Sequence, residues 1–358
     1  MSVGLLTSVS TVAQTPPPDG VLSPEVHADR TVTFRIRAPK AADVKLYGDW
    51  MPVGELQAMT KDSEGVWSFT TSPLEANVHL YWFNLDGVSI ADPVNPVIKI
   101  RQRTSASLVE VPETPPALWE VRDVPHGTVV TEWRNSAVLN RTERVVLYLP
   151  PGYETSTVRY PVLYLVHGSG DVPESWTQAG HANLILDNLI AGGKANAMIV
   201  VMPAGHALPF GTKPGGPVSN DELFDRYLTT EVMPAMEKKY RIAPGAANRA
   251  LAGLSMGGSH TIYSGFHHPA DFSALGIFSP GVAGEVSTIT KAKQPGLIWI
   301  SCGDQDMAVH YDRVKAWADS LEKAGVRETF ITYPGAHTWP VWRRSFADFA
   351  PLIFKGTK

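Results

Sequence analysis

The sequence predicts an α/β protein in which a mostly parallel sheet, covered by helices on both faces, follows a small all-β domain. From about residue 128 onward, apolar strand candidates alternate with helical segments, a pattern typical of a parallel sheet between two helical layers. Before residue 112, short strand candidates are separated by turn signals and show no helical period, which indicates a β-sandwich. The length of 358 residues, 44% of them hydrophobic, suits two domains with sizeable cores.

The same patterns divide the chain into four parts. Residues 1–19 form a tail, and its start, MSVGLLTSVSTVAQ, resembles the remnant of a weak secretory signal that lacks a positive n-region. Residues 20–112 form the β-sandwich, residues 113–127 a connector and residues 128–358 the α/β domain. A signal remnant would make the protein secreted or periplasmic.

Periodicity places the individual elements. In the N-terminal part, alternating residues between turn signals predict strands at residues 31–37, 43–47, 66–70 and 78–84. In the C-terminal part, continuous apolar runs predict strands at residues 144–149, 162–166, 198–202, 249–253, 274–278, 297–301 and 329–333. Helices are expected at residues 182–191 and 222–240, and Pro234 predicts a kink or break in the second one.

Composition excludes several classes of function. The net charge is −4 and no basic run is present, so neither nucleic acid nor an anionic membrane surface is an expected partner. No segment approaches the roughly 20 apolar residues that span a bilayer. The single cysteine, Cys302, excludes a disulfide within the chain and argues against a cysteine-based zinc cluster. Phosphate-loop and H-E-x-x-H motifs are missing as well, so we expect neither a metal nor a cofactor.

The strongest chemical signal is the pentapeptide Gly253-Leu254-Ser255-Met256-Gly257. It is a G-x-S-x-G motif that follows an apolar strand and precedes a predicted helix. In this context a serine sits on a sharp strand-to-helix turn, and glycines on either side allow close approach of the backbone. The motif therefore indicates an α/β-hydrolase fold with Ser255 as the nucleophile.

A serine nucleophile needs a base and an acid that orients the base. In this fold the acid and the histidine follow the serine in that order along the chain. His337 comes directly after the last predicted strand and is the expected base. Asp304 and Asp306 both follow the strand at residues 297–301, where open α/β sheets place their sites. The residue pattern leaves both open as the acid.

Acyl transfer also requires hydrogen-bond donors for the oxyanion. The backbone N–H of Met256 is one expected donor, because it follows the nucleophile. The other should come from the loop after the strand at residues 162–166, where the sequence reads His167-Gly168-Ser169-Gly170.

Taken together, these motifs resemble carbohydrate esterase family one, the feruloyl and acetyl-xylan esterases of the esterase D group. The similarity extends over about residues 20–356 through the segments PVLYLVHGSGD, NRALAGLSMGG, SCGDQD and GAHTWPVWRR. It implies that the N-terminal part is an immunoglobulin-like domain related to glycogen-binding modules. Where many relatives have Gly-Gln after GLSMGG and PNGH in an upstream loop, this chain has Ser259-His260 and PAGH.

The resemblance also implies roles for individual residues. The acid of such families ends a C-G-x-x-D pattern, which selects Asp306 over Asp304, and the oxyanion hole is assigned to Ser169 and Met256. Trp176 is expected near the acyl group. The substrate-binding residues expected overall are Gly168, Trp176, His206 and Trp339.

The expected function is a serine carboxylic-ester hydrolase that releases hydroxycinnamic acid or acetate from plant-cell-wall polysaccharide. A siderophore trilactone esterase of the same fold is the alternative enzyme. A carbohydrate-binding protein with an inactive esterase domain is the alternative from another class, and the intact Ser255, Asp306 and His337 argue against it. The acyl group, the polysaccharide chain and the oligomeric state stay open. Glycan binding by the N-terminal domain, through Trp50, Trp67 or Trp82, is also open against a simple packing role.

Overall fold

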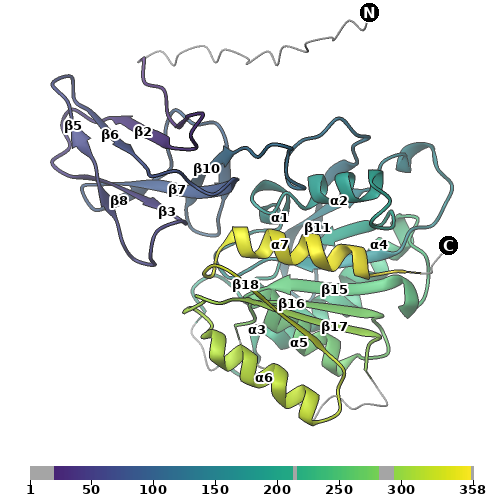
Figure 1. The fold of residues 1–358 in the computed structure, drawn as a ribbon. Helices are drawn as coiled ribbons and strands as arrows, with labels where there is room; N and C mark the ends of the chain where they lie inside the picture. The colour runs from purple at the N-terminus through teal and green to yellow at the C-terminus, as the bar shows by residue number, and fades with distance from the viewer. Residues whose placement is uncertain (1–19, 213–215, 282–293, 356–358) are drawn as a thin grey trace, which may run out of the picture.

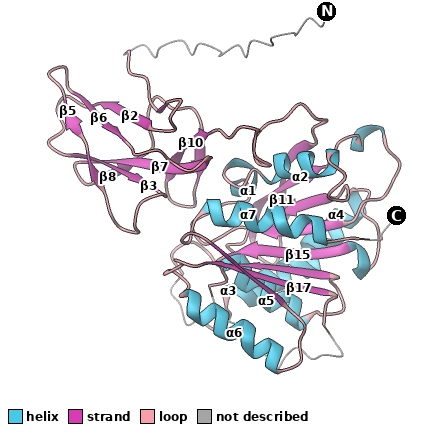
Figure 2. Ribbon diagram, in the orientation of Figure 1, coloured by secondary structure: helices cyan, strands magenta, loops and turns pink. Residues whose placement is uncertain are grey.

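The computed structural model describes residues 20–212, 216–281 and 294–355, so the predicted signal remnant at the N-terminus lies outside the described residues. An all-β domain stands beside a larger α/β domain (Figure 1; Figure 2). The last strand of the first domain, β10, ends at Val111, and the first strand of the second domain, β11, begins at Thr128. Among the described helices, none is long and apolar enough to cross a bilayer.

The first domain is a sandwich of two antiparallel sheets. One sheet has the order β1-β2-β6-β5, and the other has the order β4-β3-β7-β10-β9 with β8 paired to β7. Its strands are β1 (Glu25–Val26), β2 (Val32–Arg37), β3 (Val44–Gly48), β4 (Gln57–Ala58), β5 (Thr60–Lys61), β6 (Val66–Thr70), β7 (Asn77–Leu85), β8 (Val88–Ile90), β9 (Ile98–Ile100) and β10 (Ser105–Val111). Phe34, Leu46, Tyr81 and Phe83 point inward from both sheets and form its core, as the alternating pattern predicts.

The second domain is built on an eight-stranded sheet. Its order is β11-β12-β14-β13-β15-β16-β17-β18. The strands are β11 (Thr128–Ser136), β12 (Arg141–Leu149), β13 (Val162–Val166), β14 (Ile199–Met202), β15 (Arg249–Leu254), β16 (Ala274–Phe278), β17 (Leu297–Gly303) and β18 (Thr329–Tyr333). β12 pairs in antiparallel fashion with both β11 and β14, and the other pairs of this sheet are parallel. The predicted fold class, an α/β-hydrolase fold preceded by an all-β sandwich, is confirmed.

Helices cover both faces of this sheet. On one face, α1 (Ser175–Gln178), α2 (Ala182–Ala191) and α7 (Trp339–Phe349) share an apolar core with strand residues such as Leu163 and Ala252. On the other face, Tyr164 and Leu251 pack with residues of α3 (Asn220–Tyr227), α4 (Met233–Lys239), α5 (Met256–His267) and α6 (Tyr311–Lys323). In Figure 1, α7 crosses in front of the sheet, whereas α3 and α5 lie behind it.

The predicted helix at residues 222–240 is interrupted. Its first part, α3, continues into a π-helical turn at Leu228–Val232 and then into α4. Pro234 lies in the first turn of α4, where its missing N–H and its ring disturb the bonding of the preceding turn. The break that Pro234 predicts is thus a change of helical pitch within a continuous run.

The two domains share a buried interface. Arg343 of α7 is fully buried, and its guanidinium donates to Oδ1 of Asn77 and the carbonyl of Val78 on β7, and to the carbonyl of Ala179. Lys99 of β9 forms a buried ion pair with Asp171 in the loop after β13. Because each of these polar groups loses water, its partners across the interface must be in place.

Candidate active site

Ser255 occupies the sharp turn between β15 and α5. Its φ of 53° and ψ of −114° are unusual for a residue with a side chain. A Cβ at Gly253 would lie 2.4 Å from the backbone of Gly257, and a Cβ at Gly257 would lie 2.4 Å from the carbonyl oxygen of Val166. Both glycines are therefore needed for the turn to pack, as the G-x-S-x-G motif predicts.

A chain of hydrogen bonds runs from the serine to an aspartate. Oγ of Ser255 lies 3.0 Å from Nε2 of His337, and Nδ1 of His337 lies 2.7 Å from Oδ2 of Asp306. With Nδ1 protonated, Nε2 is free to accept the serine proton. The indole of Trp342 packs edge-on against the imidazole at 4.9 Å and supports its orientation.

Asp306 is buried at the end of β17 and fully engaged. Burial alone would raise its pKa, but the hydrogen bond and charge of His337 and the N–H of Val309 outweigh burial and lower the pKa of Asp306 below its ordinary value. It also accepts from the N–H groups of Ala308 and Val309, at 3.2 Å each. The carboxylate is thus held ionised beside the histidine.

Asp304, the competing acid, lies on the surface of the same loop and does not contact the histidine. Its carboxylate accepts from the N–H of Gly335 at 2.9 Å, and its own N–H donates to the carbonyl of Tyr333 at 2.8 Å. These bonds tie the loop after β17 to the loop that carries His337. Asp304 therefore holds the loop, and the structure brings Asp306, not Asp304, to the imidazole.

The loop after β13 lies against the nucleophile turn. A Cβ at Gly168 would fall 3.4 Å from Cβ of Ser255 and 2.7 Å from a methyl of Leu254. Ser169 and Ser255 line the same hollow. The structure thus places Ser169 and Met256, the residues predicted as oxyanion donors, beside the nucleophile turn.

His167, the first residue of this loop, connects it to a second loop. Its Nδ1–H donates to the carbonyl of Gly168, and its Nε2 accepts from the N–H of Gly205, both at 2.9 Å. Burial, reinforced by nearby His206, lowers the pKa of His167 to about 3, so the ring is neutral at pH 7. The sequence pattern marked His167 only as part of a glycine-rich loop. Its position directly after a strand was the available signal for this connecting role.

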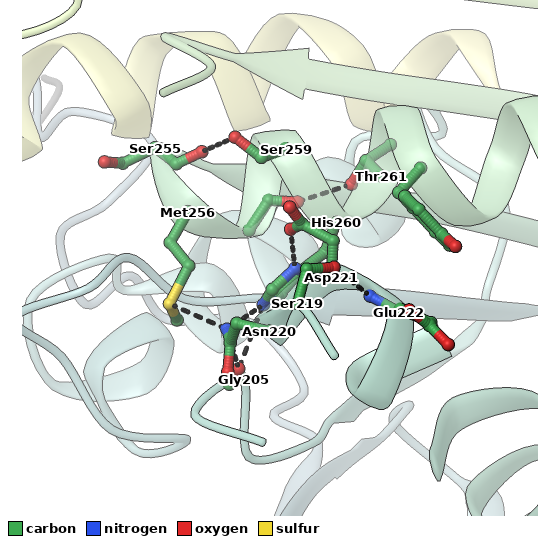
Figure 3. Close-up of polar contacts among 12 residues, drawn as sticks. Gly205, Ser219, Asn220, Asp221, Glu222, Ser255, Met256, Ser259, His260 and Thr261 are labelled. Carbon is green, nitrogen blue, oxygen red and sulfur yellow. Dashed lines mark hydrogen bonds and ion pairs between the residues drawn. The ribbon is translucent and has the colours of Figure 1, made fainter. Parts of the chain in front are cut away.

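A polar cluster connects the first turns of α5 to neighbouring segments (Figure 3). Nδ1 of the fully buried His260 lies 2.5 Å from Oδ1 of Asp221, and its Nε2 lies 2.9 Å from the carbonyl oxygen of Gly205. Nδ2 of Asn220 donates to the same carbonyl at 3.1 Å and contacts Sδ of Met256 at 3.5 Å. The cluster thus connects α3, the Gly205 loop and the residue that follows the nucleophile. Only the departure Ser259-His260 drew attention to it in the sequence.

Two hollows adjoin this site. The first, which we call the interdomain hollow, has a volume of about 290 Å³. Its lining includes Ser255, His337 and Trp339 of the α/β domain and Tyr47, Trp82, Lys99 and Arg101 of the sandwich. The second, which we call the arginine trough, has a volume of about 640 Å³ and shares Arg101, Ser169 and Gly170 with the first.

The predicted substrate-binding residues separate into two groups. Gly168 and Trp339 line the interdomain hollow, and His206 lines the arginine trough. Trp176 is placed differently from the prediction. It is 0% exposed, its Nε1–H donates to the carbonyl of Val166, and its ring packs against Phe278, Trp339 and Phe346.

Trp176 therefore cannot contact a substrate directly. The short helix α1 turns its indole toward the sheet, where it fills the core beneath Trp339. The position of Trp176 after the predicted oxyanion loop in the sequence gave no information about the direction in which its side chain points. The expectation that it lies beside the acyl group is corrected accordingly.

Comparison with known proteins places this site in a family. The sequence matches the family model Esterase over residues 136–353. The endo-1,4-β-xylanase/feruloyl esterase of Xylanibacter ruminicola is 33% identical over 341 residues, which are 93% of this chain and 46% of that protein. The chain thus spans about half the length of this relative.

Solved structures show the same fold. A ferulic acid esterase from the anaerobic fungus Anaeromyces mucronatus is 27% identical, with a TM-score of 0.58 over 66% of this chain and 93% of that one. The enterobactin esterase of Shigella flexneri is 18% identical, with a TM-score of 0.68 over 90% of this chain and 92% of that one. The family match covers more than half of the sequence and includes the residues that surround Ser255, so the chain belongs to the Esterase family.

Proposed function

We propose that the chain is a serine carboxylic-ester hydrolase that releases a hydroxycinnamic acid such as ferulic acid, or acetate, from plant-cell-wall polysaccharide. The observation that carries this proposal is the hydrogen-bonded chain of Ser255, His337 and Asp306, with distances of 3.0 and 2.7 Å. The feruloyl esterase relative, which covers 93% of the chain at 33% identity, supports the substrate class.

In the proposed mechanism, Oγ of Ser255 attacks the ester carbonyl as its proton passes to Nε2 of His337. Asp306 stabilises the imidazolium, and the backbone N–H groups of Ser169 and Met256 stabilise the tetrahedral oxyanion. His337 then protonates the leaving alcohol. Water, deprotonated by His337, releases the acid from Ser255 in the second half of the reaction.

Aromatic side chains around the site favour a flat acyl group. Trp82 and Trp339 line the interdomain hollow, and Phe210, which is 67% exposed, lines the arginine trough. One good aromatic contact contributes about 0.5–1.5 kcal/mol beyond burial. An acetyl group has no ring that can make this contact, so feruloyl esters are the favoured substrates.

The organisation of the chain follows the same proposal. We take residues 20–112 as the sandwich, 113–127 as the connector and 128–358 as the esterase domain. A polysaccharide substrate outside the cell agrees with secretion or export to the periplasm.

The experiment that tests this function is a substrate panel on the wild type and on Ser255→Ala. The panel contains methyl ferulate, acetylated xylan, an enterobactin-type trilactone and short aryl esters. We expect methyl ferulate to be hydrolysed with the highest kcat/KM, Ser255→Ala to be inactive, and a fluorophosphonate to label Ser255 alone. Labelling of another serine would exclude the proposed nucleophile. A preference for the trilactone would favour the siderophore esterase, and a wild type inactive on every ester would favour a carbohydrate-binding protein.

A further inference from the structure

The arginine trough lies directly beside the proposed oxyanion hole. Ser169, Gly170 and Met256 form part of its wall, and the turn between β9 and β10 of the sandwich forms another part. The N–H of Gln102 in this turn donates to the carbonyl of Gly170 at 3.2 Å. A group bound in the trough would therefore lie next to the reacting ester.

The charged side chains that line the trough are all positive. Its lining residues include Arg101 and Arg103 but no aspartate or glutamate. The other titratable residue in the lining is His206, and burial lowers its pKa, so it is neutral at pH 7. Within the part of the chain that the structure describes, no carboxylate lies within 4.0 Å of either arginine side chain.

Both guanidinium groups are supported by aromatic rings. Arg101 lies over the ring of Trp82 at 5.7 Å, and Arg103 lies over the ring of Phe210 at 4.8 Å. Nη2 of Arg101 is 3.4 Å from where a Cβ of Gly170 would lie, so it is held against the oxyanion loop. A guanidinium that stacks on a ring keeps its N–H edge available for a planar anion.

We propose that Arg101 and Arg103 form a subsite for a carboxylate carried by the ester substrate. Paired N–H donors of arginine match the two oxygens of a carboxylate. This inference rests on the proposed function and specifies its substrate class: an ester of an acidic polysaccharide, or an ester whose acyl group carries a second carboxylate. Arg101 lines both the trough and the interdomain hollow, in which Asp49 and Asp171 are paired with His79 and Lys99. Arg101 can therefore meet a substrate carboxylate in either hollow.

Two matched pairs of esters test the subsite. For the alcohol side, the pair is 4-acetoxybenzoate and its methyl ester. For the acyl side, the pair is mono-4-nitrophenyl adipate and its methyl ester. The measured quantity is the ratio of kcat/KM for the charged ester to that for the neutral ester, in the wild type and in Arg101→Gln/Arg103→Gln. Comparing ratios between proteins cancels the intrinsic reactivity of the leaving groups.

We expect the ratio to fall by about tenfold or more in the double variant for at least one pair, and the pair that responds identifies the side that carries the carboxylate. Arg101→Lys/Arg103→Lys keeps the charge and should retain part of the ratio. Arg313→Gln, which removes an exposed arginine from α6, should leave the ratio unchanged. Raising NaCl should lower the wild-type ratio.

The inference is overturned if the double substitution leaves the ratio unchanged in both pairs. If the charged and neutral esters lose activity by the same factor, the arginines only support the loop; if neither ester loses activity, the arginines do not act on the substrate. These results leave the proposed hydrolase intact, since the neutral esters are still cleaved. A wild type that cleaves none of the four esters would instead refute the proposed function, and with it this subsite.

Discussion

His260, on the helix that begins after the nucleophile, forms a second histidine–carboxylate pair with Asp221 of α3, with Nδ1 and Oδ1 2.5 Å apart. The imidazole stacks on Phe224 with ring centroids 4.3 Å apart and reaches the carbonyl of Gly205. Because a Cβ at Gly205 would come within 2.9 Å of the Met256 methyl group, a shift of this loop would be transmitted to the residue that follows Ser255.

The first prediction follows from this pair. Asp221→Asn and His260→Ala should lower kcat for methyl ferulate by about tenfold, short of the ~10² that a 1 Å misplacement can cost, with a smaller change in KM. His260→Gln keeps a hydrogen-bonding group and should recover much of the rate. Steady-state kinetics and far-UV circular dichroism on the three variants check this. Equal losses in His260→Gln and His260→Ala would contradict the proposed role of the hydrogen bonds at this position.

The second prediction separates the two aspartates after β17. Asp306→Asn should lower kcat by up to about 10⁴-fold, as in the serine-protease precedent, because it favours the wrong tautomer of His337. Asp304→Asn keeps the oxygen that accepts from the N–H of Gly335 and removes only the negative charge. Its effect on kcat should therefore be far smaller. Kinetics at saturating methyl ferulate decide, and a reversed order would refute the assignment of the acid.

The third prediction concerns acid stability. His167 is neutral in the folded protein, with its pKa lowered to about 3, whereas an unfolded histidine binds a proton below about pH 6.5. Its contribution to stability is therefore complete above pH 6.5 and is lost as the pH falls toward 3. His167→Gln should make the free energy of unfolding less steeply dependent on pH in this window.

Urea denaturation between pH 7.5 and pH 4 measures this slope, and His267→Gln on the protein surface is the matched histidine control. The idea fails if the two variants have the same slope.

The fourth prediction concerns the interface between the domains. Arg343→Ala leaves Asn77 and two buried carbonyls without their donor, which should lower the free energy of unfolding by about 3 kcal/mol. The neighbouring Arg344→Ala removes only a partly exposed ion pair with Glu75 and should cost about 0–1 kcal/mol. Chemical denaturation of both variants provides the comparison. Equal effects would mean that the buried network contributes no more than the surface pair.

The fifth prediction assigns different effects to two tryptophans. Trp176→Ala should cost about 3–5 kcal/mol of stability, because it empties a buried site. Trp82→Ala should instead reduce the preference for methyl ferulate over ethyl acetate by about 2- to 12-fold, the equivalent of one aromatic contact. Thermal denaturation and kinetics on both esters separate the two. An unchanged preference in Trp82→Ala would show that Trp82 does not select the aromatic acyl group.

Local sequence was sufficient for many of the elements and for the nucleophile turn. The strands at residues 162–166, 274–278 and 329–333 and the helix at 182–191 lie where periodicity predicts them, because a buried strand or an amphipathic helix needs its own apolar pattern. Ser255 lies on its turn because glycines on either side permit it. The order of strand ends along the chain also predicted which loops would meet.

Contacts between distant segments could not be predicted in the same way. The partner of Arg343 is Asn77, 266 residues away, and no local pattern encodes that pairing. The inward direction of Trp176 depends on the phase of a four-residue helix, and His260 finds Asp221 only once α3 packs on α5. The first strand of the large sheet, β11, was not predicted either, because it is mostly exposed and lacks a continuous apolar run.

The hydrogen bond between Arg343 of α7 and Asn77 of β7 can form only late in the synthesis of the chain. When Asn77 is added to the growing chain, Arg343, the residue that will satisfy it, is still 266 residues from being made. At 5–20 residues per second, this interval is on the order of tens of seconds. During this time the sandwich exposes Val78, Leu80 and Leu108, which belong to the shared core in the finished protein. A nascent chain stalled before α7 should therefore be a substrate for chaperones that bind exposed apolar strands.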